Sequence, residues 1–326
     1  MRIARPTSVA FIVAIAVLLG GGMAVVGAQV DPLSPWIGLA ALALVLAFGL
    51  RRPIRRWRAV RQPVPPRWRQ WLEQHVPVYR LADAVGRRRF ERDVQMVLAE
   101  SRFESVDGVE LTDELRLSVA AGVATLLHGR PGWELDLSRT FIFYPDTFDD
   151  DYLVDQASDY DGMVHPQGPV VLSAHAALAG WRHPEDGSNV VMHELAHLFD
   201  FADPAAMDAD GVPTLLDSAS QEAWKRLAQR EMSLARRGRS MLGRYAGSHP
   251  AEFFAVATER FFEVPTRLAQ RHPELFEALV ALYDIDPRGP AGASGAEAGA
   301  AAASGERPGG SMMARRWTGG SGQPGD

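Results

Sequence analysis

The chain of 326 residues contains no cysteine. Disulfides, thiolate zinc sites and cysteine nucleophiles are therefore excluded, and any metal must be held by histidine and carboxylate side chains. An excess of positive charge is also absent, because the formal net charge is −6. Proteins that bind nucleic acid directly through its phosphates carry a basic surface, so the composition gives no indication of such a partner.

Charge is missing altogether from two stretches near the N-terminus. Residues 8–28 are uncharged and long enough to cross a hydrocarbon core of about 30 Å as a helix. Residues 33–50 form a second uncharged run, near the lower limit of spanning length. Together they predict a transmembrane helical hairpin. The alternative for the first run is a cleaved signal peptide, in which case the second run would still anchor the protein.

Arginines follow the second run at once: Arg51, Arg52, Arg55, Arg56, Arg58 and Arg61. The positive-inside rule places such a cluster on the cytoplasmic side of a membrane, and anionic lipid headgroups are its expected partners. Arg2 and Arg5 place the N-terminus on the same side, as two spans require. We expect a protein of the inner (cytoplasmic) membrane whose body faces the cytoplasm.

Composition divides the chain into four segments. Residues 1–61 form the membrane anchor, with two transmembrane helices and the basic juxtamembrane segment. Residues 62–67 are a proline-rich linker, because consecutive prolines favour an extended backbone. Residues 68–287 form the folded domain. Residues 288–326 hold 11 glycines together with many Ala and Ser, a composition too poor in apolar side chains to pack, so this tail is predicted to be disordered.

Apolar periodicity within the folded domain predicts an α+β fold with a small sheet. Helical spacing of apolar residues recurs in residues 90–98 and, after a Thr-Asp start signal at 112–113, in 115–127. Short apolar runs bounded by turn residues predict strands at 140–144 and 169–173. Helical patterns return at 189–199, 220–236, 250–262 and 273–283.

Residues 193–197 read His-Glu-Leu-Ala-His within an apolar segment. Histidines four residues apart project from one face of a helix, so His193 and His197 can bind one metal ion. Glu194 lies beside them, where it reaches a metal-bound water as a general base. Burying these three side chains without a partner would be costly, which argues against ordinary core or surface positions. We predict a catalytic zinc site.

A catalytic zinc needs a third protein ligand. The metzincin pattern requires Gly and His where this chain has Asp200 and Asp203, so that class is excluded, and Asp203 is the less favoured candidate. Glu252 is the better one, because it opens an apolar helix after a proline. Glu259, seven residues later, shares its face and can fix a ligand histidine. The alternative is that both glutamates line an exposed helix face.

Tyr245 lies seven residues before Glu252. Its phenol could donate a hydrogen bond to the oxyanion of a tetrahedral intermediate, and simple packing is the alternative. His249 and His165 are near these elements in sequence, but their roles stay open. The strand at 168–173 precedes the metal helix, and could pair with an extended substrate by β-augmentation.

Four segments, in this order, resemble the Mlc titration factor A family of zinc-dependent peptidases over about residues 68–287. They are Tyr-Pro-Asp-Thr-Phe at 144–148, Gly-Pro-Val-Val-Leu-Ser at 168–173, Asn-Val-Val-Met-His-Glu-Leu-Ala-His-Leu-Phe-Asp at 189–200 and, after Tyr245, Pro-Ala-Glu-Phe-Phe-Ala-Val-Ala-Thr-Glu-Arg-Phe-Phe at 250–262. The resemblance implies a zincin-like metallopeptidase domain with a gluzincin-type site, similar in its core to the catalytic domain of anthrax lethal factor.

The same resemblance implies roles for single residues. His193, His197 and Glu252 match the zinc ligands, Glu194 the catalytic base and Tyr245 the transition-state donor. It also implies aminopeptidase activity on small substrates and binding of a sugar-responsive transcriptional repressor.

The sequence therefore predicts a membrane-anchored zinc metallopeptidase with one Zn²⁺ per chain, acting on a peptide or protein. An alternative is a membrane-tethered zinc-containing protein that sequesters a transcriptional regulator without proteolysis. Glu194 argues against it, because a purely structural site needs no base. A zinc hydrolase that acts on another bond also stays open.

Overall fold

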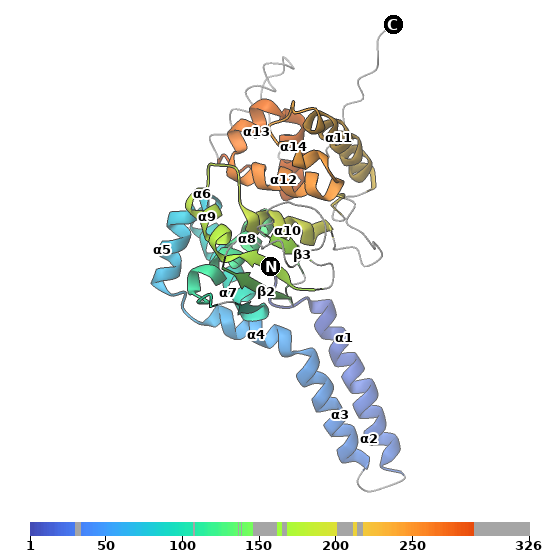
Figure 1. Cartoon of the computed structure of the whole chain (residues 1–326). Helices are drawn as coiled ribbons and strands as arrows, with labels where there is room; N and C mark the ends of the chain where they lie inside the picture. Colours follow the sequence, from blue (N-terminus) through green and yellow to red (C-terminus); the bar gives the residue numbers. More distant parts are fainter. Residues whose placement is uncertain are drawn as a thin grey trace, which may run out of the picture.

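The computed structural model describes residues 1–29, 34–106, 108–135, 137, 139–145, 162–164, 168–200, 211–213 and 218–289. The described chain is mostly helical, with one small sheet. Figure 1 shows a helical hairpin that projects from a larger body. The body has a sheet-containing half next to the hairpin and an all-helical half at the far end.

The hairpin begins with one continuous apolar helix made of α1 (Pro6–Ala16), the π-helical turn η1 (Val17–Gly21) and α2 (Gly22–Gly27). Its 22 residues are long and apolar enough to cross a membrane. α3 (Ser34–Gly49) runs back beside it (Figure 1). α3 meets the criteria for a span only together with α4 (Arg51–Arg61), from which it is bent by 51°. The structure thus has one N-terminal helix of spanning length, and the predicted second span depends on this bent pair.

Large apolar side chains cover the outside of the hairpin. Phe11, Leu18, Trp36 and Phe48 are each more than half exposed. Contiguous apolar surface of this kind is rare on soluble monomers and marks a contact with lipid or with another protein.

Arg56 joins the hairpin to the body. Its guanidinium is buried and donates two hydrogen bonds to Glu100, at 2.6 and 2.9 Å, and one to Glu134 at 3.1 Å. Arg52 donates to Glu100 as well, at 2.8 Å. Two of the six arginines predicted to face lipid headgroups therefore bind the body instead. Arg56 is the buried one of the two, and a buried charge must be paired.

The sheet has the strand order β1-β2-β4-β3. β1 (Arg102–Ser105), β2 (Thr140–Tyr144) and β4 (Val170–Ser173) are parallel, and β3 (Gly162–Val164) is antiparallel to β4. The predicted strand at 140–144 has the observed bounds, and the one at 169–173 begins one residue later. β1 and β3 were not predicted.

β4 lies between β2 and β3, so both of its edges are paired. The expectation that the strand at 168–173 pairs with an extended substrate is therefore wrong. The edge on this side of the sheet belongs to β3, whose other edge has no strand partner within the described residues.

Helices make up the rest of the body: α5 (Pro66–His75), α6 (Pro77–Leu81), α7 (Ala84–Glu100), α8 (Asp113–Leu127), α9 (Ala174–Arg182), α10 (Val190–Asp200), α11 (Ser218–Arg236), α12 (Pro250–Glu263), α13 (Pro265–Arg271) and α14 (Pro273–Tyr283). All the predicted helices are present, and α5, α6, α9 and α13 are additional. α10 and α12 pack against each other where the two halves of the body meet (Figure 1).

Gly122 explains how α10 comes close to the buried helix α8. A Cβ atom at this position would lie 2.6 Å from Cδ1 of Leu195 and 3.0 Å from Cγ1 of Val191. Glycine is otherwise unfavourable inside a helix by about 1 kcal/mol. Here it permits the close contact that fixes α10 against the core.

Candidate metal centre

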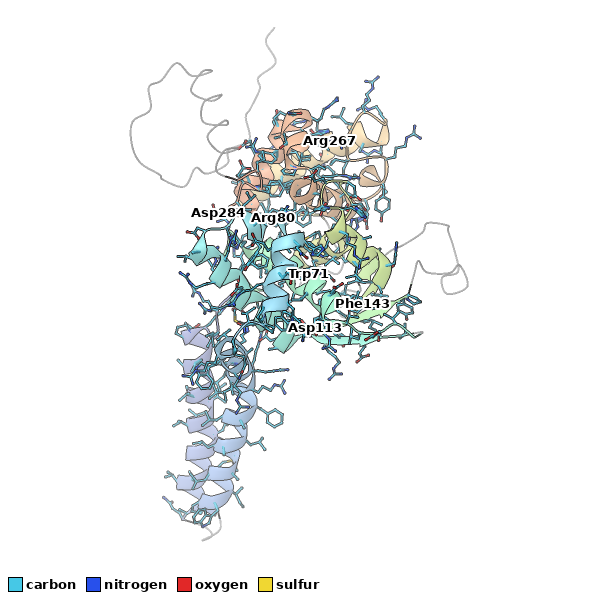
Figure 2. The ribbon with its side chains drawn as sticks, turned by 90° about the vertical axis from the view of Figure 1, so that its left-hand side faces the viewer. Trp71, Arg80, Asp113, Phe143, Arg267 and Asp284 are labelled. Carbon is cyan, nitrogen blue, oxygen red and sulfur yellow. The ribbon has the colours of Figure 1, made fainter. Side chains whose placement is uncertain are left out.

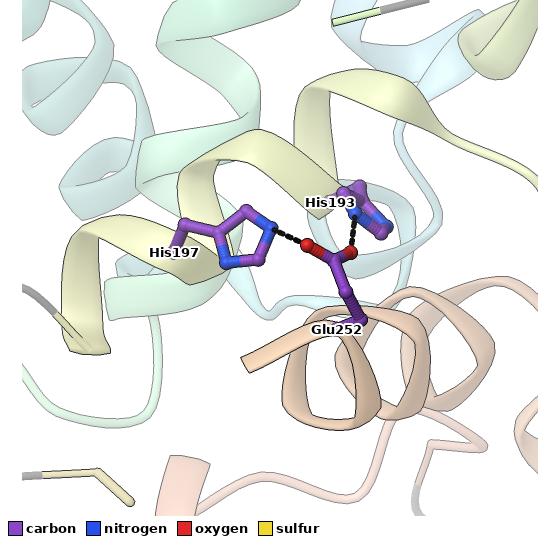
Figure 3. A group of neighbouring side chains, drawn as sticks. All are labelled: His193, His197 and Glu252. Carbon is purple, nitrogen blue, oxygen red and sulfur yellow. Dashed lines mark hydrogen bonds and ion pairs between the residues drawn. The ribbon is translucent and has the colours of Figure 1, made fainter. Parts of the chain in front are cut away.

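Two helices bring the three predicted ligands together. α10 carries His193 and His197, whose ring centroids are 5.1 Å apart. Glu252, in the first turn of α12, places its carboxylate between the two imidazoles (Figure 3). Oε2 of Glu252 is 3.1 Å from Nε2 of His193, and Oε1 is 3.6 Å from Nε2 of His197. One ligand atom from each residue lies within 4.8 Å of the others.

This donor set fits a zinc-type ion. Metal–ligand bonds of about 2.0–2.1 Å at tetrahedral angles place neighbouring ligand atoms about 3.3–3.4 Å apart. The observed separations of 3.1 and 3.6 Å lie on either side of that value. Two imidazole nitrogens and one carboxylate oxygen are also a ligand set that catalytic zinc takes from proteins.

Charge in the cluster is complementary. Burial opposes protonation of His193, but hydrogen bonds to Glu252 and Glu259 outweigh it and raise the pKa of His193 to about 10. Burial likewise opposes ionisation of Glu252, yet pairing with His193 and His197 holds the pKa of this carboxyl well below its usual range. Glu252 is therefore ionised, and a metal that binds here must displace the proton of His193, because a ligand imidazole has to be neutral.

Glu194 is on the same helix and is 5% exposed. Burial raises the pKa of its carboxyl to about 6, although the adjacent His193 and His197 act in the opposite direction. A general base works best with a pKa close to the ambient pH. The role of Glu194 as a general base stays a prediction.

Tyr245 begins the short 3₁₀ turn η3 (Tyr245–Gly247) that precedes α12. Its ring is nearly parallel to that of His193, with centroids 6.3 Å apart, and 45% of the residue is exposed. Tyr245 thus borders the ligand cluster from the solvent side. Its role as a hydrogen-bond donor to an oxyanion stays a prediction.

Three further residues were considered from the sequence, namely His249, Asp203 and His165. His249 caps α12, since its Nδ1 accepts a hydrogen bond from the backbone nitrogen of Ala251 at 3.3 Å. This contact explains His249 without a metal. Asp203, the alternative third ligand, and His165 lie outside the described residues.

Glu259 and Glu263 attach α12 to the start of α10. Oε1 of Glu259 accepts from the backbone nitrogen of Asn189 at 2.5 Å, and its Oε2 is 3.7 Å from Nδ1 of His193. Oε1 of Glu263 accepts from Nδ2 of Asn189 at 3.0 Å. The side chain of Asn189 in turn accepts from the backbone nitrogen of Met192 at 3.1 Å and caps α10.

This arrangement places Glu259 where the sequence expected it, next to a ligand histidine. Asn189 and Glu263 were not predicted. Their signals were present: an asparagine immediately before an apolar helix is a common N-cap, and Glu263 follows Glu259 by four residues, on the same face of α12.

Comparison with known proteins agrees with this geometry. The family described as "Glucose-regulated metallo-peptidase M90" matches residues 51–284. The chain belongs to the M90 metallopeptidase family. The match covers α4 to α14 and leaves α1, α2 and α3 outside the family segment. The resemblance noted in the sequence is thereby confirmed.

Several relatives are similar to this chain over more than half of its length. An uncharacterized protein of Synechocystis is 30% identical over 258 residues, which cover 72% of this chain and 89% of the relative. The Mlc titration factor A of Serratia proteamaculans is 28% identical over 69% of this chain and 90% of its own length. That of Escherichia coli is 32% identical over 58% of this chain and 76% of its own length.

A metal-binding measurement tests the ligand assignment. We expect one divalent transition metal per chain, and Glu252→Ala should weaken its binding by about tenfold or more, because a charged ligand is lost. Glu277→Ala, which removes an exposed carboxylate of α14, should leave metal binding unchanged. Equal affinity of wild type and Glu252→Ala in a chelator competition would contradict the assignment and make Asp203 the next candidate.

The shifted pKa of Glu263 predicts how the stability of the protein changes with pH. The residue is 6% exposed, and burial raises the pKa of its carboxyl to about 8 from an ordinary value of 4.5. Because the folded-state pKa is the higher one, ionisation opposes folding, and this contribution lowers stability as the pH rises from 4.5 to about 8.

Glu263→Gln keeps an oxygen acceptor for Asn189 and cannot ionise. The melting temperature of this variant relative to wild type should therefore increase with pH between about 5 and 8. Glu277→Gln, at an exposed position, should show a difference from wild type that does not change with pH. A difference for Glu263→Gln that is constant or decreases over this range would show that Glu263 does not carry the shifted pKa.

Proposed function

We propose that the protein is a membrane-anchored zinc-dependent metallopeptidase of the gluzincin type. The observation that carries the proposal is the convergence of His193, His197 and Glu252 beside the buried Glu194. Membership of the M90 family supports it. A zincin-like fold for residues 68–287 is consistent with this cluster and with the small sheet beside α10.

His193, His197 and Glu252 would hold the zinc ion, which would supply a Lewis acid for the scissile carbonyl and for the attacking water. Glu194 accepts the proton of the attacking water and passes it to the leaving amine. Its raised pKa suits both steps, since the group must gain and then lose a proton near neutral pH. Tyr245 donates a hydrogen bond to the developing oxyanion. Glu259 keeps the ring of His193 in place from its Nδ1 side.

The substrate we propose is a peptide or protein segment in extended form. β3 packs against α10 and has an edge without a strand partner among the described residues. An extended peptide that pairs with this edge would place its backbone beside the helix that carries the ligands. Whether the enzyme trims N-termini as an aminopeptidase or cleaves internally depends on what closes the ends of this site.

A second candidate follows from the relatives. Several are named Mlc titration factor A, a name that points to binding of the regulator Mlc. A membrane-tethered protein could use its metal for structure and sequester a transcriptional regulator of this kind without cleaving it. The buried Glu194 beside the cluster favours the enzyme.

The proposed location is the inner membrane, with residues 1–61 as the anchor and the catalytic domain facing the cytoplasm. The helix Pro6–Gly27 and the exposed apolar side chains of α3 support an anchor. The proposed linker, residues 62–67, is short in the structure, because α4 ends at Arg61 and α5 begins at Pro66. All but the first two residues of the predicted tail, 288–326, lie outside the described residues.

Thiol labelling tests this topology. Since the chain has no cysteine, a single introduced cysteine is the sole reactive thiol. Gln29→Cys, at the end of the hairpin, should react with a membrane-impermeant maleimide in intact spheroplasts. Arg88→Cys, exposed on α7, should react only after permeabilisation. The opposite labelling pattern, or a purified protein whose mass lacks the first run, would contradict the proposed hairpin.

Hydrolysis of a peptide library by the purified full-length protein tests the enzyme. Glu194→Gln should retain the metal and lose nearly all activity, because the base is removed without a change in shape. Tyr245→Phe should lower kcat by about 100-fold with little change in KM, as expected for a lost oxyanion donor. Metal-loaded wild type that cleaves no peptide would favour the sequestering protein, and activity in Glu194→Gln would contradict the role of Glu194.

A further inference from the structure

A cavity lies in the helical half of the body, and none of the predicted metal ligands lines it. It has a volume of about 590 Å³ and is bordered by the end of α11, α13 and the start of α14. Its polar lining consists mainly of Arg230, Arg239, Arg267, Arg271, Ser240 and His272. Figure 2 labels Arg267 at the end of the body opposite the hairpin. This cavity is called the arginine pocket below.

The carboxylates of the arginine pocket do not neutralise its arginines. Glu274 is paired with Arg230. Glu231 is buried, and its Oε2 lies 2.7 Å from Nδ1 of His272. Within the described chain, the three remaining arginines, Arg239, Arg267 and Arg271, have no ion pair and no side-chain hydrogen bond, and all three are exposed. The pocket therefore carries a concentrated, uncompensated positive charge.

Two further polar side chains, Ser240 and His272, lie beside these arginines. Gly238, with φ of +69°, turns the chain at the end of α11, so that Arg239 and Ser240 border the cavity. The hydroxyl oxygen of Ser240 is 3.3 Å from Nε2 of His272. The imidazole is held from its other side by Glu231, so its orientation is fixed before any ligand binds.

We propose that the arginine pocket binds a soluble small molecule that carries phosphate groups. A cavity of this size takes a small molecule rather than a folded partner. Guanidinium groups match the geometry of phosphate oxygens with two parallel hydrogen bonds. Three unpaired arginines at one cavity suit an anion with more than one negative charge.

The position of the pocket favours a soluble anion over a lipid headgroup as its ligand. The helices that border it, α11, α13 and α14, form the end of the body that points away from α1, α2 and α3 (Figure 1). A membrane that holds the hairpin would not reach this end. The same phosphate chemistry in a lipid of that membrane is therefore the less favoured source.

The test uses the full chain in lipid nanodiscs, with inorganic pyrophosphate as the probe and calorimetry as the readout. Wild type should bind pyrophosphate, and Arg267→Gln/Arg271→Gln should bind it about tenfold more weakly or worse, because two charge-assisted contacts are lost. The matched control is Arg88→Gln/Arg92→Gln. These are two exposed arginines four residues apart on α7, with the same change in net charge, and they should leave the affinity unchanged.

Two further comparisons vary the metal centre and the lipid composition. Affinity should be the same with and without a loaded metal centre, and the same in zwitterionic and anionic nanodiscs. No binding by wild type, or an equal loss in both double variants, would overturn the proposal. Loss of binding on metal removal would place the anion at the metal centre, and competition by anionic lipid would assign the pocket to headgroups. Each of these last two results would also overturn the proposal.

Discussion

The contact between α10 and α12 is the constraint on which the metal centre depends. α10 supplies both imidazoles, but the carboxylate that completes the cluster comes from α12, and Glu252 follows His197 by 55 residues in the sequence. A small change in the position of either helix would separate Glu252 from Nε2 of the two histidines. Since ligand atoms must lie within a few tenths of an ångström of ideal positions to hold zinc, the rest of the body has to fix this pair of helices.

Three glutamates on one face of α12 provide much of that fixation. Glu252 binds the histidines, Glu259 accepts the backbone nitrogen of Asn189 and lies beside His193, and Glu263 holds the side chain of Asn189. Burying carboxylates is costly, and each one here meets a partner on α10 or at its start. The same contacts cap α10 and orient His193, so the start of the helix and the ligand are positioned by one set of bonds.

On the opposite side, α12 is fixed by apolar packing. Trp224 of α11 lies against Phe253 and Phe254, with ring centroids 6.0 and 5.7 Å away. Phe253 and Phe254 are fully buried. The helix thus has one acidic face toward the ligand histidines and one aromatic face toward the core. Because the two faces contact different partners, α12 cannot rotate about its axis without breaking one set of contacts. Glu252 is therefore kept in the cluster.

The sequence predicted best those functional residues that form a pattern over a few neighbouring positions. His193, Glu194 and His197 follow from one helical turn, and Glu252 from a helix start preceded by proline, so the structure brings together the residues that the sequence singled out. The bounds of β2 and α14 were also predictable, because both are short apolar runs with clear stop signals. All of these predicted features are determined by residues that are close to one another in the sequence.

Features that depend on distant neighbours were missed or misjudged. β3 shields the edge of β4, and its three residues leave no alternating pattern to detect. Arg56 reads as a lipid-facing charge until Glu100 and Glu134 are brought to it from the body. Asn189 acquires its role only when α12 crosses the start of α10. In each case a tertiary contact overrides the local signal.

The central claim is that α10 and α12 together form one metal site. Anomalous diffraction at the zinc edge, from crystals of the zinc-loaded protein, tests it most directly. The predicted result is a single strong peak bonded to Nε2 of His193, Nε2 of His197 and the carboxylate of Glu252. A peak that lacks Glu252, or one bonded to Asp203 in its place, would contradict the account.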